Sequence, residues 1–434
     1  MSDSKTRDRL VRSQYESYPY PARDPEDERT RLITGSPSNI PEVNHYVFGG
    51  RRDLTAPFNA LVAGGGTGDA AMMLAQNMTD LGIPGEVVHL DMSGPSQDIA
   101  RARAEVRGLT NIRFVEGSLL DVAGIAPGLW DYIDCCGVLH HLEDPNAGLA
   151  ALASVLAPDG GIGIMVYGEY GRTGIYHMQD MLRTLAPSDD MPDSDRIDTA
   201  KRLTKALPAT AWLNRNGLIR DHLHGGDPGV YDLFLHSRDR AYTVPQIVDW
   251  VAGADMRLVS FIEPFLYDPT WLVRDPRLLK RLEPFDAITR AAFAEQFVGN
   301  LKKHVFYAVR QDNDVTAPTT DSPDVIPHLV NQSAAEAAEL MPPGGQIVVS
   351  TEGLKVDMPV PPLARMMVGL CDGKTNLAGV HAGVQEKRPE MDYETFKVQF
   401  DALYKVMSVI NRMVLRLPQW PVDDDQLPAP CPES

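Results

Sequence analysis

The segment Leu61-Val62-Ala63-Gly64-Gly65-Gly66-Thr67-Gly68 decides the fold class of this chain. A short apolar run ends in a cluster of glycines, and a helical pattern follows from about residue 69. A strand, a glycine turn and a helix together begin a βαβ unit, and glycine at such a turn lets a ligand approach the backbone closely. The segment therefore predicts a ligand site at the end of a strand.

Short apolar runs alternate with helical patterns on both sides of this turn, which indicates βαβ units and a mainly parallel sheet. We predict an α/β, Rossmann-like doubly wound fold. The strands are expected at residues 60–63, 86–90, 112–115, 130–135 and 161–167, and the helices between them at 69–81, 96–107 and 145–156. Two later strands, 256–262 and 304–310, are expected to complete the sheet as an antiparallel edge pair.

The chain is long enough for several units, since it has 434 residues. Composition shifts predict an N-terminal lid (1–55), a Rossmann-like domain (56–312) with a helical insertion at about 172–240, a linker (313–327), a small α+β C-terminal domain (328–420) and a tail (421–434). In the C-terminal domain, strands are expected at 346–350 and 354–360 and helices at 362–370, 377–384 and 393–415.

An acidic residue strengthens the prediction of a nucleoside ligand. The second strand ends in Asp91, which lies beside the glycine turn at the same sheet edge and can accept hydrogen bonds from ribose hydroxyls. The turn has the spacing GxGxG rather than the GxGxxG of dinucleotide sites. A nucleoside without a second nucleotide is therefore favoured over a nicotinamide cofactor.

Residues 60–170 resemble the class I S-adenosylmethionine-dependent methyltransferases, through the glycine turn, the acid after the second strand, and the segments "GVLHHLEDP" and "LAPDGG". The "YESYPYP" and "LHSRDRAYTVPQI" segments resemble a large multidomain bacterial subgroup, whose members include protein-lysine methyltransferases and enzymes that methylate small thiols. One departure stands out: Val62 occupies the place of the family's usual acid, so a water or a main-chain group is expected to replace it.

The resemblance implies S-adenosylmethionine as the cofactor and assigns its contacts. The glycines face the methionine, Asp91 the ribose, the third strand end the adenine, and the fourth strand end the sulfonium. An N-terminal tyrosine is expected to close over the cationic sulfonium. The cofactor residues are Gly64, Gly66, Gly68, Asp91, Met92, Ser118, Leu119, Cys136, Gly137 and Tyr20.

Methyl transfer requires alignment of donor and acceptor, exclusion of water and removal of the acceptor's proton. The candidates for these roles are His140, Tyr167, Arg172, His236 and His45. Adjacent residues tend to point apart, so His140 and His141 are not expected to act together. A metal site is not expected, because no third ligand accompanies these two histidines in the sequence.

The composition argues against some classes of binding partner and some cellular locations. A net charge of -18 disfavours nucleic acid, and no apolar run reaches the roughly 18 residues of a membrane span. The N-terminus shows no secretory signal, and the four cysteines have no metal-site spacing, so a cytoplasmic protein is expected. A homo-oligomer is left open.

The acceptor is expected to be a small nucleophile, with a thiol as the first hypothesis, because a lid and an insertion indicate an enclosed site. The alternatives are a protein lysine and a noncatalytic protein that senses S-adenosylmethionine.

Overall fold

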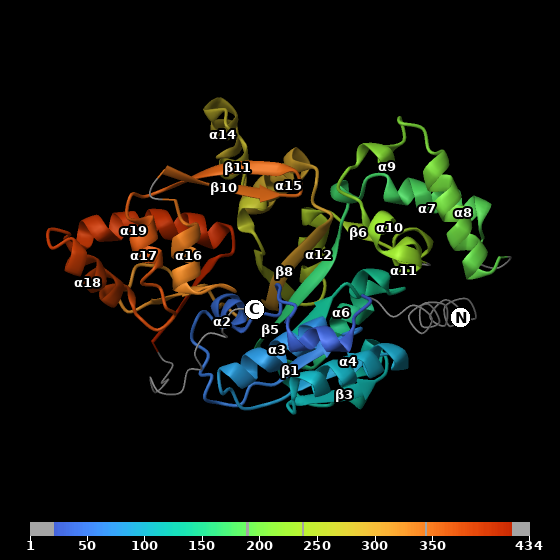
Figure 1. Cartoon of the computed structure of the whole chain (residues 1–434), viewed down its shortest axis with the longest axis horizontal. Helices are drawn as coiled ribbons and strands as arrows, with labels where there is room; N and C mark the ends of the chain where they lie inside the picture. Colours follow the sequence, from blue (N-terminus) through green and yellow to red (C-terminus); the bar gives the residue numbers. More distant parts are fainter. Residues whose placement is uncertain (1–20, 188–190, 237, 343–344, 419–434) are drawn as a thin grey trace.

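The structure, a computed structural model, describes residues 21–187, 191–236, 238–342 and 345–418 and is built around an eight-stranded sheet (Figure 1). The strand order is β3-β2-β1-β4-β5-β8-β7, and β6 pairs with the end of β5. The bounds are β1 (Ala60–Ala63), β2 (Val87–Asp91), β3 (Ile112–Glu116), β4 (Trp130–Cys136), β5 (Leu156–Gly168), β6 (Ala241–Tyr242), β7 (Met256–Phe261) and β8 (Lys303–Arg310).

The sheet is parallel from β3 to β5 and antiparallel at the β5–β8 and β8–β7 pairs. This arrangement confirms the Rossmann-like fold class and the antiparallel edge pair predicted from the sequence. The carboxyl ends of β1, β2, β3 and β4 therefore meet at one edge, where an open parallel sheet binds its ligands.

Both faces of the sheet are covered, which explains why its strands are continuously apolar rather than alternating. On β1, Ala60 and Val62 pack in a core with α2 (Ile40–Val47) and α3 (Asp69–Asp80), while Leu61 and Ala63 pack on the opposite face with α6 (Pro145–Ser154). The helix α4 (Gly94–Arg107) follows β2 and begins at the capping residue Ser93.

The helical insertion follows β5 and contains α7 (Ile175–Leu185), α8 (Asp193–Ala206), α9 (Trp212–Arg215), α10 (Asp221–His224), α11 (Gly226–Val230) and the π-helix η5 (Tyr231–Leu235). These helices share a small apolar core of their own. The chain then returns to the sheet through α12 (Val244–Ala252), and α13 (Pro269–Leu272), α14 (Pro276–Leu282) and α15 (Ala287–Val298) separate β7 from β8. The helices α7 to η5 fall within residues 172–240, where the sequence predicts a helical insertion, and they lie on the opposite side of the sheet domain from the C-terminal unit (Figure 1).

The C-terminal unit consists of β9 (Ile326–Leu329), α16 (Ala334–Leu340), β10 (Gly345–Thr351), β11 (Leu354–Val360), α17 (Ala364–Val368), α18 (Leu377–Lys387), α19 (Tyr393–Val409) and β12 (Met413–Arg416). The β10–β11 hairpin matches the two predicted strands. The prediction of one helix over 393–415 is wrong at its end, since the chain leaves α19 and forms β12, which pairs antiparallel with β9.

The prediction of a lid over residues 1–55 is wrong for α2. This helix is buried between the sheet and β12, and its Tyr46 ring stacks on Tyr307 of β8 at 5.3 Å between centroids. Asn39 caps the helix through the Glu42 amide, and Pro41 stands in its first turn. The helix is therefore part of the core, and it joins the sheet to the C-terminal unit.

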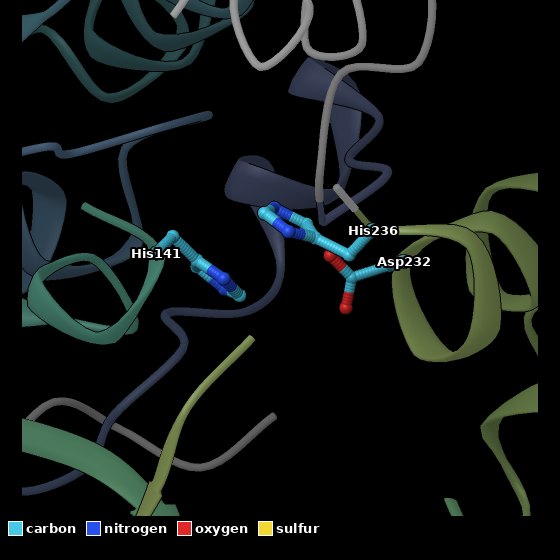
Figure 2. Close-up of side chains that lie close together, drawn as sticks. All are labelled: His141, Asp232 and His236. Atoms are coloured by element: carbon cyan, nitrogen blue, oxygen red, sulfur yellow. The ribbon is translucent and has the colours of Figure 1, made fainter. Parts of the chain in front are cut away.

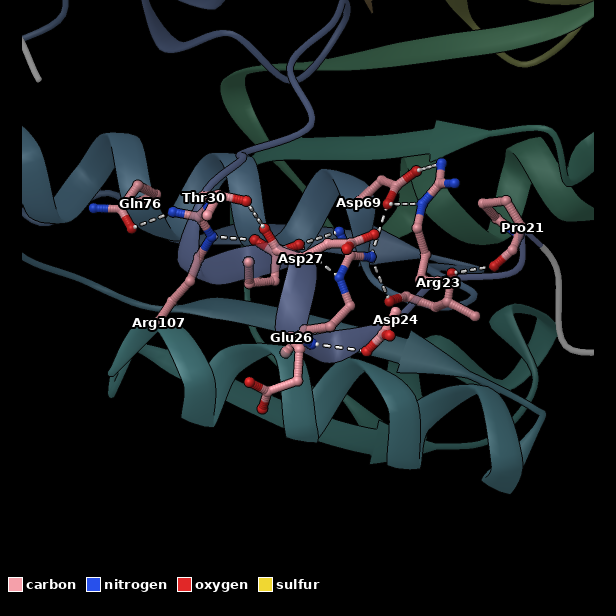
Figure 3. A network of polar contacts seen from close by, with 12 residues as sticks. Pro21, Arg23, Asp24, Glu26, Asp27, Thr30, Asp69, Gln76 and Arg107 are labelled. Carbon is pink, nitrogen blue, oxygen red and sulfur yellow. Dashed lines mark hydrogen bonds and ion pairs between the residues drawn. The ribbon is translucent and has the colours of Figure 1, made fainter. Parts of the chain in front are cut away.

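The segment before α2 is held by a buried ionic network (Figure 3). Glu28, in the 3₁₀-helix η1 (Pro25–Arg29), accepts hydrogen bonds from Arg103 at 2.5 and 2.8 Å and also contacts Arg107. Arg103 is 1% exposed and donates to Asp69 at 2.7 Å, and Asp69 in turn pairs with Arg23. This network fixes residues 21–29 across α3 and α4.

The described helices include none that is long and apolar enough to cross a membrane.

Candidate functional site

A cavity of about 320 Å³ lies at the sheet edge where β1, β2, β3 and β4 end. Gly64 and Gly66 form one wall of it, with φ angles of 74° and 52° that disfavour other residues. A Cβ on Gly64 would lie 2.5 Å from a methyl carbon of Val138. The predicted Gly68 does not line the cavity: it caps α3 and packs against Ala100 of α4.

The other cofactor residues expected at this edge are brought together around the same cavity, namely Asp91, Met92, Ser118, Leu119, Cys136 and Gly137. Asp91 accepts a hydrogen bond from the Gly66 amide at 2.7 Å and another from the Ser93 amide at 2.8 Å. Burial raises the pKa of the Asp91 carboxyl, while these amides favour its charged form. A carboxylate beside a glycine turn can bind a ribose.

A second acid, Asp134 of β4, lines the cavity and was missed from the sequence. It stands directly beside Val62 in the parallel register of β1 and β4, so the two side chains share one face of the sheet. Ser38 donates a hydrogen bond to Asp134 at 2.6 Å. Burial raises the pKa of Asp134 to about 6. The carboxyl group that Val62 cannot supply is therefore present on the neighbouring strand.

The end of the cavity next to β4 and β5 is lined by His141, Tyr167 and Asp232. His141 ends the short helix η3 (Leu139–His141) after β4, and Asp232 comes from η5 of the insertion. The Nδ1 atom of His141 lies 2.8 Å from the Arg238 carbonyl, which must accept the hydrogen bond, so Nε2 carries the ring's lone pair. Burial lowers the pKa of His141 and keeps the imidazole neutral.

Three other predicted catalytic residues surround this end without lining the cavity. His140 is buried, and its ring lies 4.0 Å from that of Tyr167. His236 stacks on His141 at 3.8 Å between ring centroids. Arg172 lies over the Tyr167 ring at 3.6 Å and forms a buried ion pair with Asp239 at 2.7 Å. Arg172 therefore braces the insertion against the end of β5.

His45 is not at the site, and its prediction as a catalytic residue is wrong. It belongs to α2, where its Nδ1 lies 2.9 Å from the carbonyl oxygen of Leu415 in β12. Burial lowers its pKa to about 4, so it is a neutral packing residue. Tyr20, expected over the sulfonium, falls outside the described residues. Pro21 lines the cavity, and its carbonyl accepts a hydrogen bond from Thr67 at 2.8 Å.

The structure also brings together three side chains that can bind a metal, although the sequence predicts no metal site. The ligand atoms of His141, Asp232 and His236 all lie within 4.8 Å of one another. The spacing of Asp232 and His236, four residues apart at the end of the insertion, is the signal that the sequence contained.

The family and sequence comparisons point to one domain type. A family model described as a methyltransferase domain matches residues 61–162. An uncharacterized protein of Synechococcus sp. is 32% identical over 277 residues, covering 62% of this chain and 63% of its own length. The tRNA 5-carboxymethoxyuridine methyltransferase of Escherichia coli K12 is 33% identical over 112 residues, 26% of this chain and 41% of its own. The chain thus spans less than two thirds of either relative.

Among solved structures, PKMT2 from Rickettsia typhi has the same fold over nearly the whole chain. It superposes with a TM-score of 0.62 at 14% identity and covers 89% of this chain and 76% of its own. PKMT2 in complex with AdoHcy gives the same TM-score at 13% identity. The likeness includes at least part of the insertion and part of the C-terminal unit, since the sheet domain alone is less than 89% of the chain.

Proposed function

We propose that this chain, which contains a class I S-adenosylmethionine-dependent methyltransferase domain, transfers a methyl group from S-adenosylmethionine to a small nucleophile, with a thiol as the preferred acceptor. One observation carries the proposal. The cavity that the glycine turn lines is also lined by His141, Tyr167 and Asp232, so the insertion contributes Asp232 to its wall. A cavity of about 320 Å³ favours an acceptor of small size.

The residues present fit S-adenosylmethionine. Gly64 and Gly66 leave the backbone open to the ligand, Asp91 can accept from the ribose hydroxyls, and the ends of β3 and β4 complete the cavity. S-Adenosylmethionine supplies an electrophilic methyl group on a cationic sulfonium. The protein's part is to orient the acceptor and to accept its proton, for which the Nε2 lone pair of His141 is suited.

The ribose assignment predicts the behaviour of Asp91→Asn. An amide in place of the carboxylate removes one charge-assisted hydrogen bond, which is worth about 1.5–3 kcal/mol, so the dissociation constant for S-adenosylmethionine should rise about 10- to 100-fold. Calorimetric titration of the folded variant measures this change. An unchanged dissociation constant would show that the ribose does not lie at Asp91.

We assign Asp134 to the ammonium group of the cofactor's methionine, in place of the acid that Val62 lacks. A cationic partner favours the charged carboxylate and so counteracts the burial that raises the Asp134 pKa to about 6. In Asp134→Asn, affinity for S-adenosylmethionine should fall about tenfold or more. Affinity for a deaminated analogue, which lacks the ammonium group, should change less.

A double variant tests whether the carboxyl group of Asp134 replaces the one that Val62 lacks. Because Val62 and Asp134 stand side by side in register, the double variant Val62→Asp/Asp134→Val moves the carboxyl by one strand. It should recover part of the affinity that Asp134→Val loses. Equal affinities of the double and single variants for S-adenosylmethionine would contradict the assignment.

The decisive test of the function is release of S-adenosylhomocysteine by the purified full chain supplied with S-adenosylmethionine and panels of thiols, amines, carboxylic acids and cell-extract proteins. Product with a thiol supports the proposal. Product only with proteins would replace the acceptor by a protein side chain such as lysine. Tight binding of S-adenosylmethionine without turnover would indicate a noncatalytic sensor.

A further inference from the structure

Two histidines and one aspartate converge at the acceptor end of the cavity (Figure 2). His141 follows β4, whereas Asp232 and His236 come from the end of the insertion, nearly a hundred positions later in the sequence. Their ligand atoms lie within 4.8 Å of one another, and both His141 and Asp232 line the cavity. Two separate parts of the chain thus place three potential metal ligands beside the methyl donor site.

We propose that His141, Asp232 and His236 bind one divalent transition-metal ion, with Zn²⁺ as the best fit, and that this ion holds the nucleophilic atom of the acceptor. The inference rests on the proposed function, because it says how the residues at the acceptor end of the cavity activate the acceptor. Two imidazoles and one carboxylate are a ligand set that leaves a coordination position open for substrate, as in catalytic zinc sites.

The protonation of His141 matches that of a metal ligand. Histidines that bind metals usually donate their second ring N–H to a carbonyl or carboxylate, which fixes the tautomer. The Nδ1–H of His141 donates to the Arg238 carbonyl at 2.8 Å, so the lone pair is on Nε2. Burial also lowers the pKa values of His141 and His236, and a neutral imidazole is the form that binds a cation.

The charges around the cluster also permit a cation. Arg172 lowers the pKa values of both histidines, and Arg238 also lowers that of His236. Both arginines have acidic partners, since Arg172 pairs with Asp239 at 2.7 Å and Arg238 with Glu143 at 3.4 Å. Asp232 adds a negative charge within the cluster itself. An incoming ion would therefore meet a carboxylate and two neutral imidazoles rather than an uncompensated guanidinium.

The orientation of the two histidine rings means that one of them must rotate before both can bind the ion. The rings of His141 and His236 are stacked with an interplanar angle of 26°, and the Nδ1 of His236 accepts a hydrogen bond from the Arg238 amide at 3.1 Å. Since ligand lone pairs lie in the ring plane, one imidazole must rotate about its Cβ–Cγ bond to face the ion. Rotation of His236 gives up the hydrogen bond from the Arg238 amide in exchange for a metal–nitrogen bond.

The ion would activate the acceptor in the following way. A thiol that binds the metal loses its proton to solvent and becomes a metal-bound thiolate, as coordinated thiols do. The thiolate sulfur forms a bond to the methyl carbon while the bond from that carbon to the sulfonium breaks. The electron pair of the broken bond stays on the donor sulfur, which leaves as the neutral thioether S-adenosylhomocysteine, and no redox change occurs.

The test measures metal binding apart from activity. The full chain is stripped with a chelator, dialysed and titrated with Zn²⁺, and the retained ion is counted by elemental analysis. The proposal expects one ion per chain. Each of His141→Ala, Asp232→Asn and His236→Ala should weaken Zn²⁺ binding by at least the ~10–100-fold that loss of an outer-shell partner costs. The control His224→Ala, an exposed histidine of the same insertion, should bind as the parent does.

Cobalt substitution adds a spectroscopic readout. Co²⁺ at the site should give visible d–d bands that each of the three ligand variants loses, and addition of an acceptor thiol should produce a sulfur-to-cobalt charge-transfer band. Absence of stoichiometric Zn²⁺, or equal binding by the parent and the three variants, would overturn the proposal. Binding of S-adenosylmethionine, titrated in the same samples, separates the two proposals. A protein that binds and uses the donor without a metal would contradict the metal site alone. A protein that binds the metal but not the donor would contradict the proposed function.

Discussion

Replacement of His141 by alanine should reduce the rate constant for methyl transfer by about 10²- to 10⁴-fold, the range expected when a positioned acid–base group is removed. The same variant should bind S-adenosylmethionine nearly as tightly as the parent, because His141 follows β4, whereas the glycine turn and Asp91 stand at the ends of β1 and β2. The loss is expected whether His141 accepts the acceptor's proton or binds an ion that lowers the acceptor's pKa. Single-turnover kinetics with saturating donor measure the rate constant.

The matched control for this variant is His177→Ala, since His177 is an exposed residue of α7 in the insertion. It should leave both the rate constant and the donor affinity unchanged. A folded His141→Ala protein with the parental rate constant would remove the cluster from the chemistry. A loss confined to donor affinity would instead place His141 in the donor site.

Glu28→Ala should lower the free energy of unfolding by about 3–5 kcal/mol, the usual result of removing one partner from a buried ion pair. Glu28 is 5% exposed and Arg103 is 1% exposed, so the variant leaves a buried guanidinium with only Asp69 and the Thr67 carbonyl as partners. Urea unfolding followed by circular dichroism measures the change. The midpoint should shift even if the units of the chain do not unfold in one step.

The control for Glu28→Ala lies two residues earlier in the same 3₁₀-helix. Glu26 pairs with Arg29 at the surface, where both side chains are mostly exposed, and Glu26→Ala should leave the urea midpoint within experimental error. Equal midpoints for the two variants would mean that the network does not stabilise the fold. A lower donor affinity in Glu28→Ala alone would show that η1 also holds Pro21 at the cavity.

The sheet could be predicted because its signals are local. The glycine turn directly follows its strand, the acid Asp91 ends the next, and turn residues bound the apolar runs, so β1 to β4 were predicted to within one residue of their bounds. The start of β5 was placed at residue 161, whereas the strand begins at Leu156. The strands β9 and β12 could not be predicted in this way. Each has only four residues, Pro327 interrupts the first, and they form a pair only because the chain returns after α19.

Site residues were predicted correctly where their position depends on the end of a single strand. They were missed where the position depends on how two strands pair. Asp91 follows its strand at the expected edge, whereas the relation of Asp134 to Val62 depends on the register of β1 against β4. The choice of His140 over His141 depended on which ring the 3₁₀-helix turns toward the cavity. The position of His45 was wrong because composition shifts assigned residues 1–55 to a lid, although Asn39, Pro41 and Glu42 are typical of a helix start.

The burial of α2 between β8 and β12 has a practical consequence for anyone who divides this protein. A truncated form that begins at residue 56 would remove Val43 and Val47 from the sheet, and one that ends at residue 325 would strip β12 from the opposite side of the same helix. Either cut exposes an apolar surface that the whole protein never shows to water. A chimera that exchanges the C-terminal unit between relatives should therefore exchange α2 together with residues 326–416, although the two segments lie near opposite ends of the chain.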